Sequence, residues 1–253
     1  SSDLCPTIQN QKMKLLNRIA VITGAGKGIG KTTAELFLKE GAKVVLTSRN
    51  KSDLEQFIAG NESKKDNITI IAGDISKEET IQNVIDETIG KYGKADILVN
   101  NAGFGIFDNM VDSKTEDFDT VFNTNVRALY LITKGFLPHM IKEHSGTIIN
   151  IASVAGKQGF ATGAIYCASK HAVMGISRAL MLEVRQYNIR VCAICPGSVA
   201  TDFFRTDSQT TLSSSKESVL QAEEIAETIL LAASLPENAL IGEIEIRPTN
   251  PRK

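Results

Sequence analysis

The chain has 253 residues, of which 42% are hydrophobic, so it is long enough to bury a sizeable core in one large domain or two small ones. Its 28 basic and 29 acidic side chains give a formal net charge of −1, which shows no sign of binding to nucleic acid or another polyanion. No apolar run approaches the length needed to cross a bilayer. We therefore expect neither a nucleic-acid nor a membrane partner.

Residues 1–13, SSDLCPTIQNQKM, are polar, show no periodic pattern and lack the apolar core of a signal peptide. We interpret them as a tail in front of a single domain over residues 14–253.

Short apolar runs of β type alternate with longer helical patterns through the rest of the chain. Strands are expected at residues 18–23, 43–48, 68–72, 96–100, 146–152, 190–195 and 242–247. Segments between them, such as 30–41 and 77–93, repeat apolar residues at helical spacing. Most of the strands are unbroken apolar runs, which suits a parallel sheet covered on both faces. The pattern predicts one doubly wound α/β domain of Rossmann type, with a parallel sheet of about seven strands and helices on both faces.

The turn between the first strand and the first helix reads TGAGKGIG. Glycines let the backbone approach a pyrophosphate, and the helix that follows offers free N–H groups and the positive end of its dipole. The position after a first strand is the one that a dinucleotide-binding turn requires; the alternative is a tight turn with no ligand. The candidate cofactor-binding residues here are Thr23, Gly24, Lys27, Gly28, Ile29 and Gly30.

The end of the second strand bears on the choice of cofactor. An acidic residue at this place would bind the ribose hydroxyls of NAD, but the chain has Ser48 and Arg49. A guanidinium suits a 2′-phosphate, and Lys27 can add a second positive charge. We therefore favour NADP(H) over NAD(H), the alternative being that Arg49 is an ordinary surface arginine.

The third strand ends at Asp74 and Ile75, which we place near the adenine of a bound dinucleotide. Asp74 can equally belong to the start of the next helix, because Ser76 and Glu79 have the spacing of a capping box. Both roles are compatible, since Ser76 is the better cap.

The fourth strand runs into Asn100, Asn101, Ala102 and Gly103, where small residues allow the cofactor's sugar to pass close to the backbone. Asn100, Ala102 and Gly103 are candidate cofactor contacts.

Further along, Ser153, Tyr166 and Lys170 have the spacing Ser-x12-Tyr-x3-Lys. Two residues four apart on a helix share one face. A nearby ammonium favours the phenolate and lowers the pKa of a phenol, which is ordinarily about 10. With a serine hydroxyl on the same substrate oxygen, this makes a proton-transfer device for a carbonyl and its alcohol. Tyr-x3-Lys by itself is compatible with an accidental helix pair.

The cysteines are Cys5, Cys167, Cys192 and Cys195. The last two have C-x-x-C spacing but lie in an apolar run, IRVCAICPG, that ends a strand, and no second pair or histidine cluster accompanies them. We interpret them as buried free thiols, expect no metal site, and consider a reducing cytoplasm the fitting compartment. Residues 201–218, which are polar and rich in Ser and Thr, follow the sixth strand and are placed to act as a lid over a substrate.

Taken together, these motifs identify the chain as similar to short-chain dehydrogenases/reductases of roughly 250 residues. The resemblance runs from about residue 14 to residue 247 and rests on motifs in one order: the turn of residues 23–30, Asn100 to Gly103, the serine, tyrosine and lysine, and Pro196-Gly197. It implies NADP(H)-dependent hydride transfer in a homodimer or homotetramer.

The resemblance also implies roles. Tyr166 resembles the general acid of reduction, or base of oxidation, and Lys170 resembles the residue that lowers its pKa and holds the nicotinamide ribose. Both are also candidate cofactor contacts. Ser153 resembles the hydroxyl that polarises the substrate carbonyl. Asn125 matches the asparagine that helps to hold a water in the proton relay, with Asn123 the less favoured candidate. Pro196, Gly197, Val199 and Thr201 match the turn that supports the nicotinamide carboxamide and the diphosphate.

One departure from the resemblance concerns the C-terminus. Many relatives have an Asp-Gly-Gly segment after the last strand, whereas this chain reads IGEIEIRPTNPRK. This argues against 3-oxoacyl-carrier reduction and the usual tetramer contacts, and the chain is more similar to small carbonyl, ketone and pterin reductases.

The leading hypothesis is therefore a cytoplasmic NADPH-dependent reductase of a small-molecule ketone or aldehyde. A 3-oxoacyl-carrier-protein reductase of fatty-acid synthesis is the alternative within the class, and a non-catalytic nucleotide-sensing scaffold is the alternative outside it. The sequence does not identify the substrate. An apolar cleft can be lined by Phe104, Ile106, Val154, Phe160, Phe203 and Phe204, but core packing explains each of them equally well.

Overall fold

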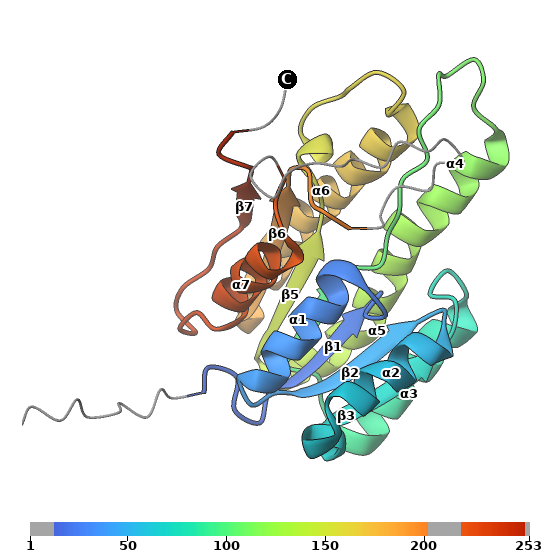
Figure 1. Ribbon diagram of the computed structural model, residues 1–253. Coiled ribbons are helices and arrows are strands. Elements are labelled where there is room, and N and C mark those ends of the chain that lie inside the picture. Colours follow the sequence, from blue (N-terminus) through green and yellow to red (C-terminus); the bar gives the residue numbers. More distant parts are fainter. Residues whose placement is uncertain (1–12, 202–218, 251–253) are drawn as a thin grey trace, which may run out of the picture.

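The computed structural model describes residues 13–201 and 219–250 (Figure 1). Residues 1–12 of the expected tail lie outside the described residues. So do residues 202–218 of the expected lid, with Phe203 and Phe204.

The core of the molecule is a parallel sheet of seven strands in the order β3-β2-β1-β4-β5-β6-β7. The strands are β1 (Ile19–Thr23), β2 (Lys43–Ser48), β3 (Ile68–Ala72), β4 (Ile97–Asn100), β5 (Gly146–Ile151), β6 (Ile189–Pro196) and β7 (Glu243–Ile246). Each begins and ends within one residue of the sequence-based expectation. The strand order and the parallel pairing confirm the predicted fold class.

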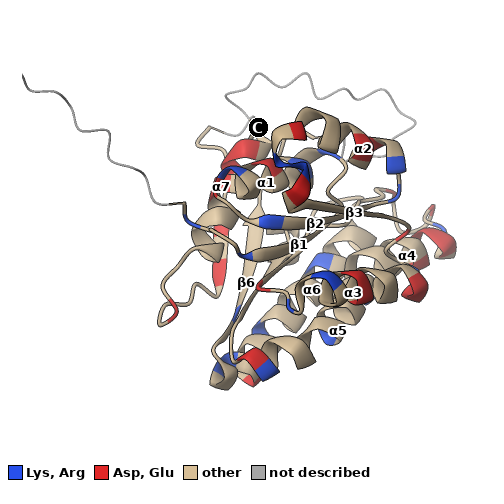
Figure 2. Cartoon of the chain, turned by 90° about the horizontal axis from the view of Figure 1, so that it is seen from below, with Lys and Arg blue, Asp and Glu red and all other residues tan. Residues whose placement is uncertain are grey.

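Helices cover both faces of this sheet. The α-helices of the described residues are α1 (Gly28–Lys39), α2 (Lys51–Gly60), α3 (Glu78–Tyr92), α4 (Thr115–Phe122), α5 (Ala128–Glu143), α6 (Ala164–Val184) and α7 (Ala222–Ala233). Helices α1, α2 and α7 pack on one face, and α3, α5 and α6 pack on the other (Figure 2). Because both faces are covered, the central strands β1 and β5 are buried at every residue.

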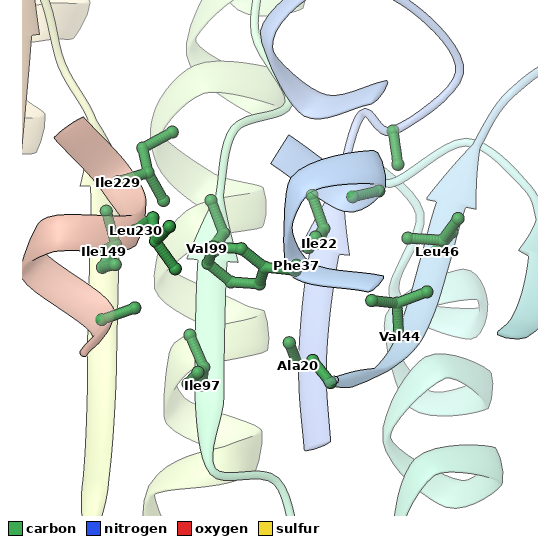
Figure 3. Close-up of a cluster of buried hydrophobic side chains, with 14 of the residues drawn as sticks. Ala20, Ile22, Phe37, Val44, Leu46, Ile97, Val99, Ile149, Ile229 and Leu230 are labelled. Atoms are coloured by element: carbon green, nitrogen blue, oxygen red, sulfur yellow. The ribbon is translucent and has the colours of Figure 1, made fainter. Parts of the chain in front are cut away.

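Figure 3 shows how one face is filled. Phe37 of α1 is completely buried and lies against the sheet among aliphatic side chains of β1 and β4, such as Ile22 and Val99. Ile229 and Leu230 of α7 extend the same cluster toward β5. This dry packing fixes α1, whose N-terminus faces the site, against the strands that carry the rest of it.

The start of α3 differs from the expectation. The helix begins at Glu78 with Lys77 as its N-cap, and no side chain caps it, so Ser76 is not the cap. The Oδ1 atom of Asp74 accepts a hydrogen bond from the backbone N–H of Ser76 at 3.0 Å. This local bond makes a turn of Asp74 to Ser76 and delays the helix, as short acidic side chains commonly do.

The strand order reverses between β1 and β4, which are neighbours in the sheet while β2 and β3 lie to one side. In an open parallel sheet this reversal leaves a crevice beyond the carboxyl ends of the strands, where ligands bind. A ligand site is therefore expected at the segments that follow Thr23 and Asn100.

Candidate active site

A cleft of about 780 Å³ lies at this edge of the sheet, within the size range of small-molecule sites. Its walls come from the segments that follow β1, β2, β3, β4, β5 and β6, and from α6. The cleft has two ends. We call the part near the glycine turn and the ends of β2 and β3 the nucleotide end, and the part around Tyr166 the substrate end.

The glycine turn forms the floor of the nucleotide end. Gly24 and Gly28 have φ angles of +65° and +54°, which other residues rarely adopt. A Cβ on Gly24 would lie 2.9 Å from the Cα of Ala102, so the loop after β4 approaches the bare backbone. Helix α1 begins at Gly28, and its first N–H groups therefore face the cleft as an anion site.

Three of the predicted cofactor residues, Thr23, Gly30 and Asn100, do not line the cleft but support it. The Thr23 hydroxyl accepts hydrogen bonds from the N–H groups of Asn101 and Ala102, both at 3.0 Å. The Asn101 side chain in turn donates to the carbonyls of Thr23 and Gly24 at 2.9 and 3.1 Å. Asn101, which the sequence analysis did not single out, thus joins the loop after β4 to the glycine turn.

Asn100 lies in the core between β4 and α5. Its amide donates to Thr133 Oγ1 at 2.9 Å and to Asn150 Oδ1 at 2.8 Å, and Asn150 is its register partner on β5. Asn100 therefore holds neighbouring strands together behind the cleft wall instead of touching a ligand in it.

The end of β2 brings together residues of both charges. Ser48, Arg49 and Lys27 line the cleft as expected, but so does Asp53 in the first turn of α2. A Cβ on Gly26 would lie 2.5 Å from Ser48 Oγ and 3.1 Å from Asp53 Oδ2, so this carboxylate stands over the glycine turn beside Ser48. Ser48 and Arg49 at the end of β2 are not acidic, and the nearby acid, Asp53, comes in the first turn of the helix that follows. The acidic residue in that turn is the sequence signal for it.

At the substrate end, β5 and α6 present the expected trio. Ser153 follows β5 and caps a short 3₁₀ turn, its Oγ accepting from the Ala155 N–H at 3.1 Å. Tyr166 and Lys170 share one face of α6, with the Lys170 Nζ 5.8 Å from the centroid of the Tyr166 ring. Lys170 Nζ donates to the carbonyl of Ile151 at 2.8 Å. All of the trio line the cleft.

Burial shifts the pKa values of Tyr166 and Lys170. It raises the pKa of Tyr166 to about 12, although a hydrogen bond with Ser153 lowers it in part. It lowers the pKa of the Lys170 ammonium to about 8. That Lys170 lowers the pKa of Tyr166 stays a prediction. The hydrogen bond with Ser153 favours the phenolate. Burial outweighs it because taking a phenolate out of water is costly.

Asn125 lies in a π-helical turn, Asn123–Arg127, between α4 and α5; such turns are frequent at functional sites. It is 2% exposed and does not line the cleft, whereas Asn123 does. Its amide oxygen accepts from the N–H of Phe104 at 3.0 Å and its amide nitrogen donates to the Phe104 carbonyl at 2.9 Å. In this structure Asn125 therefore fixes the backbone of Phe104.

The turn after β6 closes the cleft over α1. Pro196, Gly197, Val199 and Thr201 all line it, and the N–H of Gly197 donates to the Ile246 carbonyl of β7 at 2.8 Å. After β3, Asp74 and Ile75 line the cleft. So do Ile29 of α1 and, after β4, Ala102 and Gly103.

The apolar candidates separate into two groups. Phe104, Val154 and Phe160 line the cleft, and Ile106 does not. Phe107, which the sequence analysis passed over, lines it instead.

Residues 13–201 and 219–250 were compared with the side-chain arrangements that metal sites and thiol redox sites require. Within these residues no group of three His, Cys, Asp or Glu side chains is arranged to hold a metal ion. Cys192 and Cys195 are free and buried, as expected, and Cys167 is as well. Burial raises the pKa of Cys192 to about 12 and of Cys195 to about 11. Such thiols are poor nucleophiles and poor metal ligands. None of the described helices is both long and apolar enough to span a membrane.

Comparison with known proteins gives a consistent result. The sequence model of the family described as short chain dehydrogenase matches residues 18–212. A Staphylococcus aureus (strain MRSA252) protein described as an uncharacterized oxidoreductase is 34% identical over 234 residues, which are 92% of this chain and 98% of that protein.

Two solved structures share the fold closely. The closed form of a serine dehydrogenase complexed with NADP+ is 30% identical, with a TM-score of 0.84 over 90% of this chain and 94% of that one. A 3-ketoacyl-(acyl-carrier-protein) reductase from Brucella melitensis complexed with NADH is 32% identical, with a TM-score of 0.84 over 93% of this chain and 98% of that one.

Proposed function

The chain belongs to the short-chain dehydrogenase family, and from that premise we propose that it is an NADPH-dependent oxidoreductase that reduces a ketone or aldehyde to an alcohol. The observation that carries the proposal is a single cleft with Ser153, Tyr166 and Lys170 at one end and the glycine turn with Arg49 at the other. An anion-binding end and a proton-donating end in one cleft are what hydride transfer from a dinucleotide requires.

The residues present fit a dinucleotide. Gly24 and Gly28 leave the backbone open where a Cβ would fill the space, and the N-terminus of α1 faces that opening. Lys170 Nζ lies 3.5 Å from the position of a Cβ on Gly103, so it stands beside the segment where small residues admit a sugar. We assign Lys170 to the ribose nearest the substrate. Bound NADPH supplies the hydride that reduces the carbonyl carbon.

The protein's part in the reaction is the proton. Tyr166 donates it to the carbonyl oxygen as the alkoxide develops, and Ser153 donates a hydrogen bond to the same oxygen. A phenol with a pKa of about 12 remains protonated at neutral pH. Tyr166 therefore already carries, at neutral pH, the proton that reduction requires.

Cofactor preference follows from the balance of charges at the nucleotide end. Arg49 and Lys27 favour the 2′-phosphate of NADPH, and we propose that NADPH is preferred. Asp53 stands beside Ser48 and acts in the opposite direction, because a carboxylate repels phosphate and accepts hydrogen bonds from ribose hydroxyls. We expect a moderate preference for NADPH, with NADH still used.

Two alternatives remain open to test. The Brucella melitensis neighbour supports a 3-oxoacyl-carrier-protein reductase. A nucleotide-sensing scaffold without turnover is disfavoured, because a protein freed from catalysis has no need to keep Ser153, Tyr166 and Lys170 together in the cleft.

Location and assembly are part of the same proposal. Buried free thiols are compatible with a reducing compartment, and we propose the cytoplasm. We also propose a homodimer or homotetramer, supported by exposed apolar rings such as Phe118 of α4 and Tyr130 of α5. Sedimentation velocity measures the assembly directly; a monomer at all concentrations would contradict it.

The function itself is tested by following NADPH oxidation with a panel of ketones, aldehydes, quinones and 3-oxoacyl thioesters. We expect turnover with at least one ketone or aldehyde. Turnover of 3-oxoacyl thioesters alone would replace the proposal with carrier-protein reduction. Tight NADPH binding with no turnover of any compound would support the scaffold.

A further inference from the structure

The substrate end of the cleft carries a row of aromatic rings that begins at the proposed proton donor. The ring of Phe107 meets the ring of Tyr166 edge to face, with 5.5 Å between centroids and 67° between planes. Phe160 continues the row, its ring 5.7 Å from that of Phe107. Phe107 and Phe160 both line the cleft, and Phe160 is 50% exposed. We call these two residues the aromatic wall.

Both rings of the aromatic wall pack against glycines. A Cβ on Gly105 would lie 2.5 Å from Cζ of Phe107, and a Cβ on Gly163 would lie 2.5 Å from Cζ of Phe160. Neither glycine has a positive φ, so space and not backbone conformation makes glycine the fitting residue there. The rings are thus held against the backbone beside Tyr166, and an incoming ligand meets a surface that is already in place.

Charge is distributed unequally along the cleft. The charged side chains among its described lining residues are Lys27, Arg49, Asp53, Asp74, Lys77 and Lys170. All except Lys170 belong to the nucleotide end. Lys157, which follows the turn after Ser153, does not line the cleft and forms an ion pair with Glu243 of β7 at 2.7 Å. Within the described residues, the substrate end therefore has no lining cation for a carboxylate or phosphate beyond the lysine assigned to the ribose.

From these observations we propose that the substrate is a neutral ketone or aldehyde with an aromatic group, which packs on Phe107 and Phe160 while its carbonyl oxygen meets Tyr166 and Ser153. The inference rests on the proposed carbonyl reduction and specifies its substrate class. Offset or edge-to-face packing between rings favours aryl groups over saturated groups of equal size. In the reaction NADPH is oxidised, its hydride forms the new C–H bond, Tyr166 donates the proton to oxygen, and the aryl group is unchanged.

Four ketones test the substrate class on the wild-type protein at saturating NADPH: acetophenone, cyclohexyl methyl ketone, 2-butanone and 4-acetylbenzoate. The first two differ in aromaticity at equal size, and the last adds only a carboxylate to acetophenone. We expect the highest kcat/KM for acetophenone, with about a tenfold loss for 4-acetylbenzoate, because a buried carboxylate lacks a partner. A higher kcat/KM for 4-acetylbenzoate or for 2-butanone would overturn the inference.

Variants test the aromatic wall itself. Phe160→Ala should lower kcat/KM for acetophenone about tenfold and leave 2-butanone nearly unchanged. Phe160→Leu, which keeps an apolar side chain and protects folding, should give an intermediate loss. Leu231→Ala is the matched control, since Leu231 of α7 is also a half-exposed apolar side chain but does not line the cleft.

The two proposals fail in distinguishable ways. Equal losses for acetophenone and 2-butanone in Phe160→Leu would overturn the aromatic wall and leave carbonyl reduction standing. Absence of turnover for all four ketones, together with none in the wider panel, would overturn the proposed function and this inference with it.

Discussion

The two ends of the cleft are built differently. The nucleotide end is built on main-chain groups of a glycine turn, of the first turn of α1 and of the carboxyl ends of β2 and β3, and charged side chains line it in addition. The substrate end is made of side chains that come from three distant segments, around Phe107, around Ser153 and on α6. A ligand shared by many proteins can be held by main-chain groups, which any sequence supplies. The individual substrate has to be recognised by side chains.

The largest effect is expected at the substrate end, when the proton donor alone is removed. Tyr166→Phe keeps the ring that Phe107 contacts and removes only the hydroxyl. General acid catalysis is worth about 10²–10⁴-fold, so kcat should fall by that range. Tyr130→Phe, at an exposed position on α5, should retain the wild-type rate. A Tyr166→Phe enzyme with near wild-type kcat would assign the proton to another group.

At the other end, Arg49→Ala should weaken NADPH and spare NADH. A charge-assisted hydrogen bond from a guanidinium contributes about 1.5–3 kcal/mol, which corresponds to a loss of about tenfold to a hundredfold in NADPH affinity. Binding titrations with both cofactors measure the difference. Equal losses for NADPH and NADH would show that Arg49 does not contact the 2′-phosphate.

Lys170 connects the two ends, and its titration gives a pH prediction. With a pKa of about 8 it is an ammonium below pH 8 and loses its proton above it. Tyr166, with a pKa of about 12, remains an acid throughout this range. Reduction should therefore be level near neutrality and decline as pH rises through about 8. Lys170→Met should be slower and lack this decline, whereas Lys134→Met on the surface of α5 should keep it.

If the decline persisted unchanged in Lys170→Met, another group would control the pH profile. The original expectation, that the lysine lowers the pKa of the tyrosine, predicts instead that alcohol oxidation shifts to higher pH in Lys170→Met. The two pH profiles distinguish these accounts.

The smallest effect concerns Asp53. Asp53→Asn removes the carboxylate beside Ser48 and should raise the ratio of kcat/KM for NADPH to that for NADH by about threefold to tenfold, since partly exposed charges interact weakly. Glu55→Gln, in the same helix and paired with Lys51, is the control and should leave the ratio unchanged. An unchanged ratio in Asp53→Asn would limit Asp53 to a role in the first turn of α2.

How much the sequence predicts follows from how each end is built. Strands and the glycine turn are continuous in the chain, so hydrophobic runs and spacing locate them within a residue, and Ser48 and Arg49 stand where the pattern places them. Ser153, Tyr166 and Lys170 are recognised by spacing because two of them share a helix face.

What the sequence did not predict depends on tertiary contacts. Asp53 reaches the glycine turn only because α2 starts immediately after β2, and Asn101 is distinguished from Asn100 by which side of the strand end it occupies. Phe107 lines the cleft, whereas Ile106 one residue earlier does not. Neither residue composition nor hydrophobic periodicity distinguishes residues that are adjacent in the sequence, such as Asn100 and Asn101.

We propose that the two ends of the cleft work independently, one binding NADPH and the other donating the proton. The most direct test is the NADPH dissociation constant of the wild type, Tyr166→Phe, Arg49→Ala and the double variant. Tyr166→Phe keeps the ring and leaves the nucleotide end unchanged, so it should change the constant by about twofold or less. Because distant sites add within about 0.3–0.5 kcal/mol, Arg49→Ala should weaken binding by the same factor in both backgrounds. A large loss of NADPH binding in Tyr166→Phe, or an Arg49→Ala effect that depends on Tyr166, would contradict it.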